Sequence, residues 1–250
     1  MTNRRADIAR AWPGFSRAWR KMQVLLKWLL MLRRIQGTFP AECPMCGYTG
    51  LFLGTGDPLR YNAKCPACGS VERHRLFWLA QTRLTLFSAS DKILHFAPEA
   101  CASQLIRRSC HEYRSADLQD GHADVVLNIE GIALPDESVD VVIASHVLEH
   151  VDDKAALSEI WRILKDRGRL IVMIPIIEGW ALTYENPLIT SAKERTAHFG
   201  QCDHVRYYGR EFRERVESAG FSLSEFDCEG GEVVKYALLR GEKVFICRKG

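Results

Sequence analysis

The sequence lacks the features of fibrous, disordered, disulfide-stapled and membrane-spanning proteins. Its 250 residues are 47% hydrophobic and 26% charged, without internal repeats, which excludes collagen-like and low-complexity chains and leaves enough apolar surface for a core. The most apolar N-terminal stretch, Val24–Leu32, has nine residues and contains Lys27, so it is too short to cross a bilayer. No small-residue cleavage site follows it, so we expect no secretory signal.

The sequence also has little net charge, but the total of +3 is the sum of a basic N-terminal part and an acidic remainder. Residues 1–36 carry nine Lys and Arg against one acid, whereas the rest carries 25 Lys and Arg against 30 Asp and Glu. Residues 111–160 alone contain twelve acids and two bases. Because nucleic-acid-binding proteins usually present a basic face, the acidic body argues against nucleic acid as a partner.

The basic N-terminal part, residues 1–37, is predicted to be a helical arm. Residues 15–35 place Trp and Leu opposite Lys and Arg, as in an amphipathic helix. Such a helix suits a membrane surface, but it would equally pack on its own protein or on a second subunit. We expect a cytoplasmic protein, with the arm either at the inner face of the membrane or against protein.

Four of the nine cysteines form one pattern, Cys43-x-x-Cys46 and Cys65-x-x-Cys68, with 18 residues between the pairs. This spacing indicates a zinc site, because each pair places two thiolates on one tight turn. Four thiolates leave no open coordination position, so residues 38–72 are predicted to be a structural four-cysteine zinc ribbon in a reducing compartment. The alternative is two redox-active or unpaired turns. We expect the other cysteines to be small buried hydrophobes: Cys101, Cys110, Cys202, Cys228 and Cys247.

Residues 73–250 alternate between strand and helix patterns, which predicts an α/β fold with a doubly wound parallel sheet. A closing pair of strands, 221–227 and 243–248, lacks a helix pattern between them and predicts an antiparallel hairpin at the sheet edge. The other strands are expected at 92–96, 113–117, 124–128, 139–145 and 169–174, and helices at 71–87, 98–109, 152–168 and 209–219.

The first strand of this part ends in the segment 95–99, His-Phe-Ala-Pro-Glu, which lacks the Gly-x-Gly of dinucleotide-binding folds. Those glycines let backbone amides approach a pyrophosphate, so their absence disfavours a diphosphate cofactor. Asp117 ends the second strand, 22 residues after His95, at the usual position of an acid that binds ribose hydroxyls.

Two further segments carry a family resemblance. Residues 134–151 contain Leu-Pro, then Ser-Val-Asp before a β-branched strand and His-Val-Leu-Glu-His-Val after it, and residues 161–170 read Trp-Arg-Ile-Leu-Lys-Asp-Arg-Gly-Arg-Leu. Together they resemble class I S-adenosylmethionine-dependent methyltransferases, in the branch of the ubiquinone and menaquinone methyltransferases. The resemblance covers about residues 90–250. It implies an enzyme with a Rossmann-like, seven-stranded sheet whose last strand is antiparallel, and S-adenosylmethionine as cofactor.

The resemblance also implies the cofactor site. Asp117 would hold the ribose, Asn128 and Ile129 would flank the adenine, and residues 95–99 would lie beside the methionyl end. The family's acid-x-Gly-x-Gly motif is replaced here, and we interpret the replacement as a variant loop in which Glu99 accepts a hydrogen bond from the cofactor's ammonium. The alternative is that His95 and Glu99 only cap the next helix. The full implied set is His95, Phe96, Ala97, Glu99, Asp117, Leu118, Asn128, Ile129, Ser145 and His146, with a packing role for His150.

The insertion between residues 175 and 209 is the candidate substrate region, since such segments overhang the carboxyl edge of the sheet. His198 or His204 is the candidate base, with Asp203 orienting one of them. Candidate substrate-binding residues are Arg206 and Tyr207, with Arg73 and His74 from the segment after the ribbon. The alternatives are a hydrogen-bonded loop that stiffens the pocket wall and, for Arg73 and His74, a helix cap.

The sequence thus predicts transfer of a methyl group to an oxygen or nitrogen of a small-molecule, saccharide or lipid-linked acceptor. A zinc-ribbon RNA methyltransferase is the first alternative, favoured by the arm and ribbon and opposed by the acidic body. A non-catalytic zinc-ribbon scaffold, whose altered first motif no longer binds cofactor, is the second.

Overall fold

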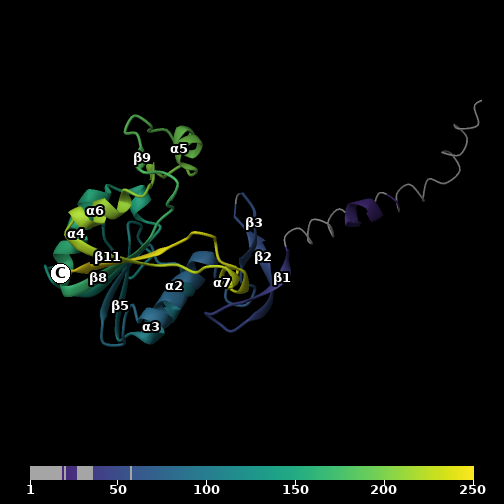
Figure 1. Ribbon diagram of the computed structural model, residues 1–250, viewed down its shortest axis with the longest axis horizontal. Helices are drawn as coiled ribbons and strands as arrows, with labels where there is room; N and C mark the ends of the chain where they lie inside the picture. Colours follow the sequence, from purple (N-terminus) through teal and green to yellow (C-terminus); the bar gives the residue numbers. More distant parts are fainter. Residues whose placement is uncertain (1–18, 20, 27–35, 57) are drawn as a thin grey trace, which may run out of the picture.

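The computed structural model describes residues 19, 21–26, 36–56 and 58–250 (Figure 1). Residues 19 and 21–26 are helical, and the rest of the predicted 1–37 arm before residue 36 lies outside the described residues. Among the described residues, no helix combines the length and apolarity needed to span a membrane.

Most of the chain forms a seven-stranded sheet in the order β11-β12-β8-β7-β4-β5-β6. Strand β12 is antiparallel to both of its neighbours, and the remaining pairs are parallel. The doubly wound, Rossmann-like sheet with an antiparallel last strand is therefore confirmed. The strands are β4 (Lys92–Phe96), β5 (Glu112–Asp117), β6 (Val125–Val126), β7 (Val139–Ser145), β8 (Leu164–Met173), β11 (Phe221–Phe226) and β12 (Val244–Lys249).

Helices cover both faces of the sheet and define two cores. On one face, α4 (Asp153–Ile163) and α6 (Phe212–Ser218) pack against Leu94 and Phe96 of β4. On the other face, α2 (Glu72–Leu84), α3 (Ala100–Ser109) and α7 (Gly231–Lys235) pack against Ile93 and its neighbours. The buried strands read as continuous apolar runs because both of their faces are covered.

Several local predictions differ from the structure. Helix α4 ends at Ile163 instead of near Gly168, because Leu164 already pairs with Val139 in the sheet. A short helix, α7, stands between β11 and β12, where no helix was expected; its five residues are too few to show helical periodicity. Cys202 is exposed and Cys101 half-buried, whereas the other three non-ribbon cysteines are buried as predicted.

The N-terminal module is a three-stranded antiparallel sheet, β1 (Gln36–Glu42), β2 (Thr49–Thr55) and β3 (Arg60–Lys64). Cysteine turns precede β2 and follow β3, and their sulfurs face a small core around Phe52. In Figure 1 this module lies beside α7, at the end of the sheet domain opposite the C-terminus. Its apolar core is small, so its attachment to the large domain depends on polar contacts.

Arg75 of α2 supplies that attachment, although its side chain is fully buried. Its guanidinium donates to the carbonyls of Ala63 (3.0 Å) and Ser70 (2.8 Å) in the ribbon, and to those of Tyr236 (2.8 Å) and Ala237 (2.5 Å) after α7. Burial lowers the pKa of Arg75 from its ordinary value. One buried cation thus satisfies four carbonyl groups from three chain segments.

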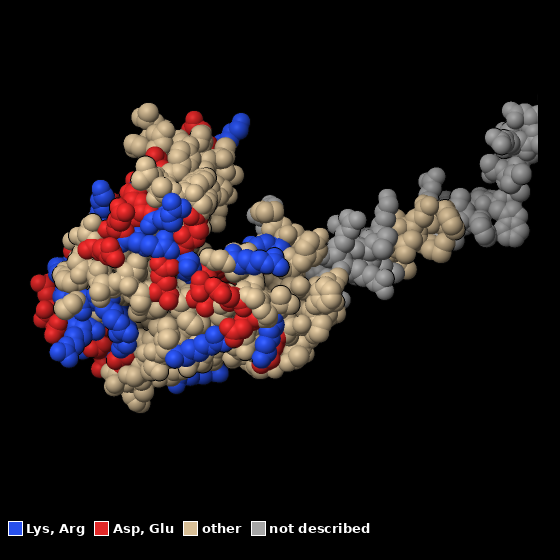
Figure 2. Space-filling view, viewed as in Figure 1, with Lys and Arg blue, Asp and Glu red and all other residues tan. Residues whose placement is uncertain are grey.

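Charged side chains are mixed over the visible surface. Figure 2 shows Lys and Arg interspersed with Asp and Glu over the sheet domain, whereas the ribbon and the segment above the sheet are mostly uncharged. On this face of the described chain, opposite charges lie side by side, so no large field of one sign forms there.

We predict that Arg75→Met lowers the free energy of unfolding by about 3 kcal/mol, because four carbonyls lose a charged donor inside the protein. Urea unfolding at neutral pH measures the change. Arg83→Met is the matched control on the same helix, since Arg83 is partly exposed and pairs with Glu232 at the surface; its effect should stay below about 1 kcal/mol. Equal effects of the two variants would contradict the attachment role of Arg75.

Candidate functional site

A cleft of about 430 Å³ opens at the carboxyl ends of the central strands. Strand order reverses between β4 and β7, which is where doubly wound sheets bind ligands. Predicted cofactor residues from four separate loops line the cleft: Phe96, Ala97, Asp117, Leu118, Ile129 and His146. Residues 195 and 203 of the overhanging segment close its other side.

A larger hollow of about 620 Å³ lies between α4 and α6, lined by residues such as Trp161 and Glu214. It opens on the outer surfaces of these two helices and includes none of the strand-end loops. The smaller cleft is therefore the better candidate site, because the side chains of several loops converge there.

The backbone bends sharply at two of the strand ends. Ala97 after β4 and His146 after β7 adopt φ values of +46° and +55°, in the left-handed region that residues other than glycine rarely occupy. Hydrogen bonds hold both bends, from Ala97 N to Ala116 O at 2.9 Å and from His146 N to Met173 O at 2.8 Å. Such fixed, strained positions gather at functional sites.

Asp117 and Ile129, the residues expected beside the ribose and the adenine, both line the cleft. Asp117 is half-buried at the end of β5, with Oδ1 accepting from the backbone of Gln119 at 2.9 Å. Ile129 is buried and forms part of the cleft wall. Asn128 differs, because its exposed side chain accepts from Glu130 N at 3.0 Å and so shapes its own loop.

The segment 95–99 divides between two sides of the sheet. Phe96 lines the cleft, His95 and Glu99 line a narrow pocket with Ser145 on the side of α2, and Ala97 lines both. His95 Nδ1 lies 2.9 Å from the hydroxyl of Tyr113, and burial lowers the pKa of His95 to about 4, so the imidazole is neutral. The alternation of side chains along a strand causes this division.

Glu99 is held by the two α2 residues that were candidate substrate contacts. Arg73 Nε donates to Glu99 at 2.8 Å, and His74 Nε2 also contacts the carboxylate. Burial opposes the charge, but the hydrogen bonds from His74 and Arg73 lower the pKa of Glu99 to about 2. Glu99 begins α3 without a side-chain cap. Glu99 therefore connects the loop 95–99 to α2. An ammonium group of the cofactor would have to share the Glu99 carboxylate with Arg73 and His74.

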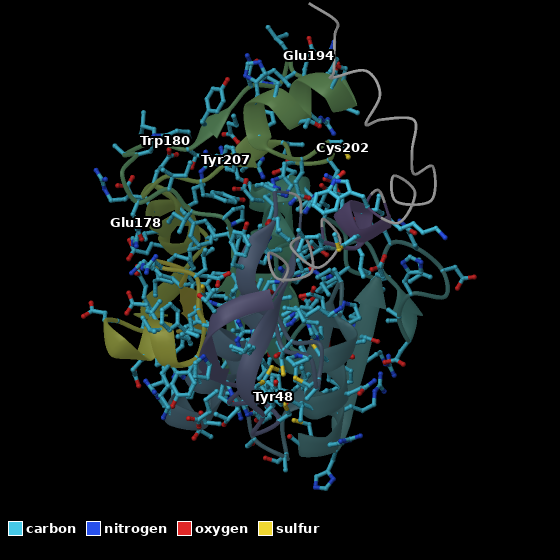
Figure 3. The ribbon with its side chains drawn as sticks, turned by 90° about the vertical axis from the view of Figure 1, so that its right-hand side faces the viewer. Tyr48, Glu178, Trp180, Glu194, Cys202 and Tyr207 are labelled. Atoms are coloured by element: carbon cyan, nitrogen blue, oxygen red, sulfur yellow. The ribbon has the colours of Figure 1, made fainter. Side chains whose placement is uncertain are left out.

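The predicted overhang, residues 175–209, contains β9 (Tyr184–Glu185), α5 (Ala192–Phe199) and β10 (Arg206–Tyr207), and it lies above the sheet in Figure 1. Figure 3 shows Trp180, Cys202 and Tyr207 together in this segment, far from Tyr48 of the ribbon. His198 is exposed on α5, with Nδ1 2.7 Å from the hydroxyl of Tyr184, and it does not line the cleft.

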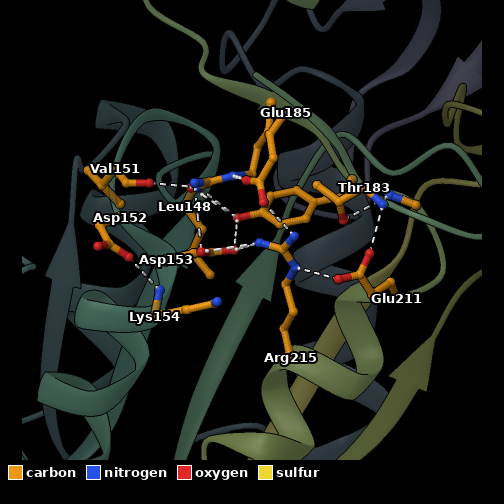
Figure 4. Close-up of polar contacts among 12 residues, drawn as sticks. Leu148, Val151, Asp152, Asp153, Lys154, Thr183, Glu185, Glu211 and Arg215 are labelled. Atoms are coloured by element: carbon orange, nitrogen blue, oxygen red, sulfur yellow. Dashed lines mark hydrogen bonds and ion pairs between the residues drawn. The ribbon is translucent and has the colours of Figure 1, made fainter. Parts of the chain in front are cut away.

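Arg206 is buried and fastens the overhang, of which Figure 4 labels Thr183 and Glu185, to the sheet domain. It donates to the carbonyls of Leu148 (2.9 Å) and Val151 (2.6 Å) and to Glu185 (2.8 Å). Arg215 of α6 also binds Glu185, at 2.8 Å. The guanidinium predicted to bind substrate is thus occupied by protein groups, and Tyr207 packs at the edge of the Trp180 ring.

Both the second candidate base and its partner lie near the cleft. Asp203 lines the cleft with His150, whose Nδ1 is 3.3 Å from Asp203 Oδ2. His204 is buried against the edge of the His150 ring, with 4.6 Å between the ring centroids, and its Nδ1 is 3.2 Å from the carbonyl oxygen of Phe199. His150, expected to have a packing role, is therefore part of the cleft wall.

Two glutamates that we had not predicted surround His146. Glu149 Oε1 lies 3.1 Å from Nδ1, and Glu242 Oε1 lies 3.8 Å from Nε2. Burial opposes protonation, but these two carboxylates raise the pKa of His146 to about 9. Glu149 stands inside the recognised motif and could have been selected. Glu242 lies between α7 and β12, more than 90 residues from His146, and no sequence signal connects them.

The four ribbon cysteines converge, with their sulfur atoms within 4.8 Å of one another. Both turns repeat one hydrogen-bond pattern: Gly47 N donates to Cys43 O at 2.9 Å, and Gly69 N donates to Cys65 O at 3.0 Å. Gly47 and Gly69 both have φ near +75°, a conformation that glycine adopts without strain because it has no Cβ. Four converging sulfurs on paired turns suit a tetrahedral ion that prefers thiolate ligands.

Comparison with known proteins finds a family match for part of the chain. Residues 65–172 match the family model described as a methyltransferase domain. An uncharacterised protein of Methanocaldococcus jannaschii is 44% identical over 50 residues, which are 20% of this chain and 22% of that protein. The chain thus matches about a fifth of the length of this curated relative.

Among solved structures, the [4+2]-cyclase SpnF has a TM-score of 0.50 and 16% identity, covering 70% of this chain and 80% of its own. A methyltransferase of Archaeoglobus fulgidus dependent on S-adenosylmethionine scores 0.47 with 16% identity, covering 68% and 91%. Geranyl diphosphate C-methyltransferase of Streptomyces coelicolor scores 0.48 with 14% identity, covering 68% and 78%. At this identity the likeness to the cyclase shows the fold alone.

We predict that Glu99→Gln destabilises the protein at neutral pH, because Arg73 and His74 lose their carboxylate. The folded-state pKa of Glu99, about 2, is below its ordinary value of 4.5, so this stabilisation exists above pH 4.5 and is lost as the pH falls through 2. The difference in unfolding free energy between wild type and variant should therefore shrink on acidification. Glu112→Gln is the control, since Glu112 is 68% exposed; a pH-independent difference for Glu99→Gln would refute the linkage.

Proposed function

We propose, from the methyltransferase domain matched over residues 65–172, that this chain is a class I S-adenosylmethionine-dependent methyltransferase, and that the cleft at the ends of β4, β5 and β7 binds S-adenosylmethionine. The methyl group is transferred to an oxygen or nitrogen of a small-molecule, saccharide or lipid-linked acceptor. The observation that carries the proposal is the convergence of Ala97, Asp117, Ile129 and His146, from four loops, on one cleft. S-adenosylmethionine supplies a methyl group activated by a sulfonium cation.

The charge of the cleft supports a cationic ligand. Asp117 and Asp203 line it together with one base, Arg195, and the half-buried His146 is accompanied by the carboxylates of Glu149 and Glu242. With the histidine protonated, these four carboxylates still outnumber the two cations. Phe96 and Ile129 provide apolar surface beside these acids. A negative, partly apolar cleft attracts a sulfonium bearing an adenine ring.

The proposed role of the protein in the chemistry is to align the acceptor and withdraw its proton. Asp203, His150 and His204 form the titratable group on the overhang side of the cleft. His204 and Asp203 remain the proposed catalytic residues, with His150 added. His198 is not retained as a base, because it lies outside the cleft lining.

The proposed domain organisation is an arm at 1–37, a ribbon at 38–72 and the methyltransferase domain at 73–250. The ribbon cysteines hold one zinc ion, with Cys43, Cys46, Cys65 and Cys68 as ligands. The converging sulfurs support this proposal. Arg75 donates to the ribbon carbonyls of Ala63 and Ser70, so its positive charge lies on the side of the ribbon that carries the cysteine turn and offsets part of the negative charge of a four-thiolate zinc centre.

A zinc-ribbon RNA methyltransferase is the second candidate, favoured by the nine bases of residues 1–36. RNA affinity would fall steeply with added salt, because binding releases counterions. Filter binding of a structured RNA between low and physiological salt tests this candidate. Weak, salt-independent binding would exclude it.

We predict that Asp117→Ala weakens binding of S-adenosylmethionine about tenfold or more, since a hydrogen bond to a charged group contributes about 1.5–3 kcal/mol. Isothermal titration calorimetry on the full chain measures the change. Asp120→Ala is the matched control, because Asp120 is exposed in the same loop and does not line the cleft. Absence of binding to the wild type would overturn the proposed function and favour a non-catalytic scaffold.

We predict that Cys46→Ser removes one zinc ion per chain and lowers the stability of the ribbon, because a tetrahedral site loses a thiolate ligand. Metal analysis of the purified chain by mass spectrometry measures the loss. Cys202→Ser is the control, since Cys202 is exposed in the overhang. Unchanged zinc content in Cys46→Ser would exclude the four-cysteine centre.

A further inference from the structure

We propose that Glu149, His150 and His204 form a second metal site, which binds a divalent transition-metal ion beside the cofactor cleft. Each of these residues offers a ligand atom, and the three atoms lie within 4.8 Å of one another. Glu149 and His150 belong to the short 3-10 helix η2 (Leu148–His150) after β7, and His204 comes from the overhang. The inference deepens the proposed function, on which it rests for the role of the ion in catalysis.

The carboxylate of Glu149 is the main evidence for a bound cation. Its side chain is fully buried, and Oε1 is bound by His146, but Oε2 has no hydrogen-bond partner among the described residues. A buried carboxylate oxygen without a partner is costly, because it has lost its hydration. A cation at Oε2 would remove this cost.

The two histidines have the partners that metal ligands typically have. His204 directs Nδ1 to the carbonyl oxygen of Phe199 at 3.2 Å, and His150 directs Nδ1 to Asp203 at 3.3 Å. Each ring is thereby oriented through one nitrogen, which leaves Nε2 available to a metal. A backbone carbonyl or a carboxylate on the second nitrogen is the usual support of a metal-bound imidazole.

The donor set indicates the class of metal. Two imidazoles and one carboxylate suit Zn²⁺, Fe²⁺ or Co²⁺, whereas Mg²⁺ and Ca²⁺ prefer oxygen ligands alone. Three protein ligands leave at least one coordination position open, as in catalytic sites. His150 lines the cleft, so the open position is accessible to the acceptor.

A bound ion would serve the proposed methyl transfer to oxygen. With His150 and His204 bound to the ion, Asp203 is the remaining base of this group. Coordination lowers the pKa of an acceptor hydroxyl, so its proton leaves to Asp203 and then to water. The acceptor oxygen then forms a bond to the methyl carbon as the methyl–sulfur bond breaks. The metal itself is neither oxidised nor reduced.

The site also connects the overhang to the sheet domain. Val205 N donates to the carbonyl of Glu149 at 2.9 Å, which already holds the overhang next to η2. Because His204 precedes Val205 and the other two ligands lie in η2, a bound ion would add a second connection at the same place. Metal binding should therefore stabilise the overhang in the position that it has in this structure.

Cobalt spectroscopy on the full chain, with zinc already bound at the cysteines, tests the site. Added Co²⁺ should give visible d–d absorption for one ion per chain, without the intense thiolate-to-metal bands that cobalt at the cysteines would show. Glu149→Gln and His204→Ala should each weaken this binding at least tenfold. His122→Ala is the control, because His122 is exposed before β6 and lies outside the cluster.

The zinc content and the unfolding curve of each variant show whether it is folded, so weak binding by a folded variant supports the site. Absence of the second cobalt ion from the wild type, or its retention in Glu149→Gln, would overturn the metal site. Calorimetry with S-adenosylmethionine distinguishes failure of the metal site from failure of the proposed function. Cofactor binding without cobalt binding rejects only the metal site, whereas cobalt binding without cofactor binding rejects the methyltransferase.

Discussion

The buried guanidinium of Arg75 is the contact on which the arrangement of the two folded parts depends. It binds carbonyls of the ribbon and of the segment after α7, and it stacks over the Phe52 ring at 4.8 Å. A buried charge is tolerated only when its donors are satisfied, so the ribbon, α2 and α7 must be positioned together. Helix α2 then presents Arg73 and His74 to Glu99, which begins α3 after the cofactor loop. The ribbon therefore influences the cleft through one helix.

The opposite side of the cleft is held by a second group of buried charges. Asp153 is almost fully buried and accepts from Tyr208 at 3.0 Å and from Arg215 at 3.1 Å, while Arg206 joins the same network (Figure 4). These contacts fix the overhang above the strand ends before any ligand binds. Preorganised side chains of this kind reduce the ordering required on binding. The residues that line the cleft therefore do not have to hold the overhang in place. Among the described residues, Glu149 Oε2 has no hydrogen-bond partner.

Much of the fold could be predicted from local patterns. The strands 92–96 and 139–145 were predicted to the residue, because their apolar runs lie between clear boundaries. Asp152 caps α4 as expected, with its carboxylate accepting from Lys154 N at 3.0 Å. The end of α4 was misplaced, since the sheet pairing of Leu164 outweighs a helical pattern that continues toward Gly168. Pairing partners distant in sequence leave no local signal at such boundaries.

By itself the sequence determined the alternating α/β pattern, the four cysteines and the strand-end position of Asp117, because each depends on spacing along the chain. Only the tertiary structure decided which side chains meet. It separated Phe96 from His95 by sheet alternation, bound Arg206 to main-chain carbonyls, and placed Glu242 next to His146. These contacts depend on distances between segments far apart in sequence, and the charged neighbours that they bring together shift the pKa values of Glu99 and His146. The spacing of residues along the chain gives neither the distances between these segments nor the pKa values of these groups.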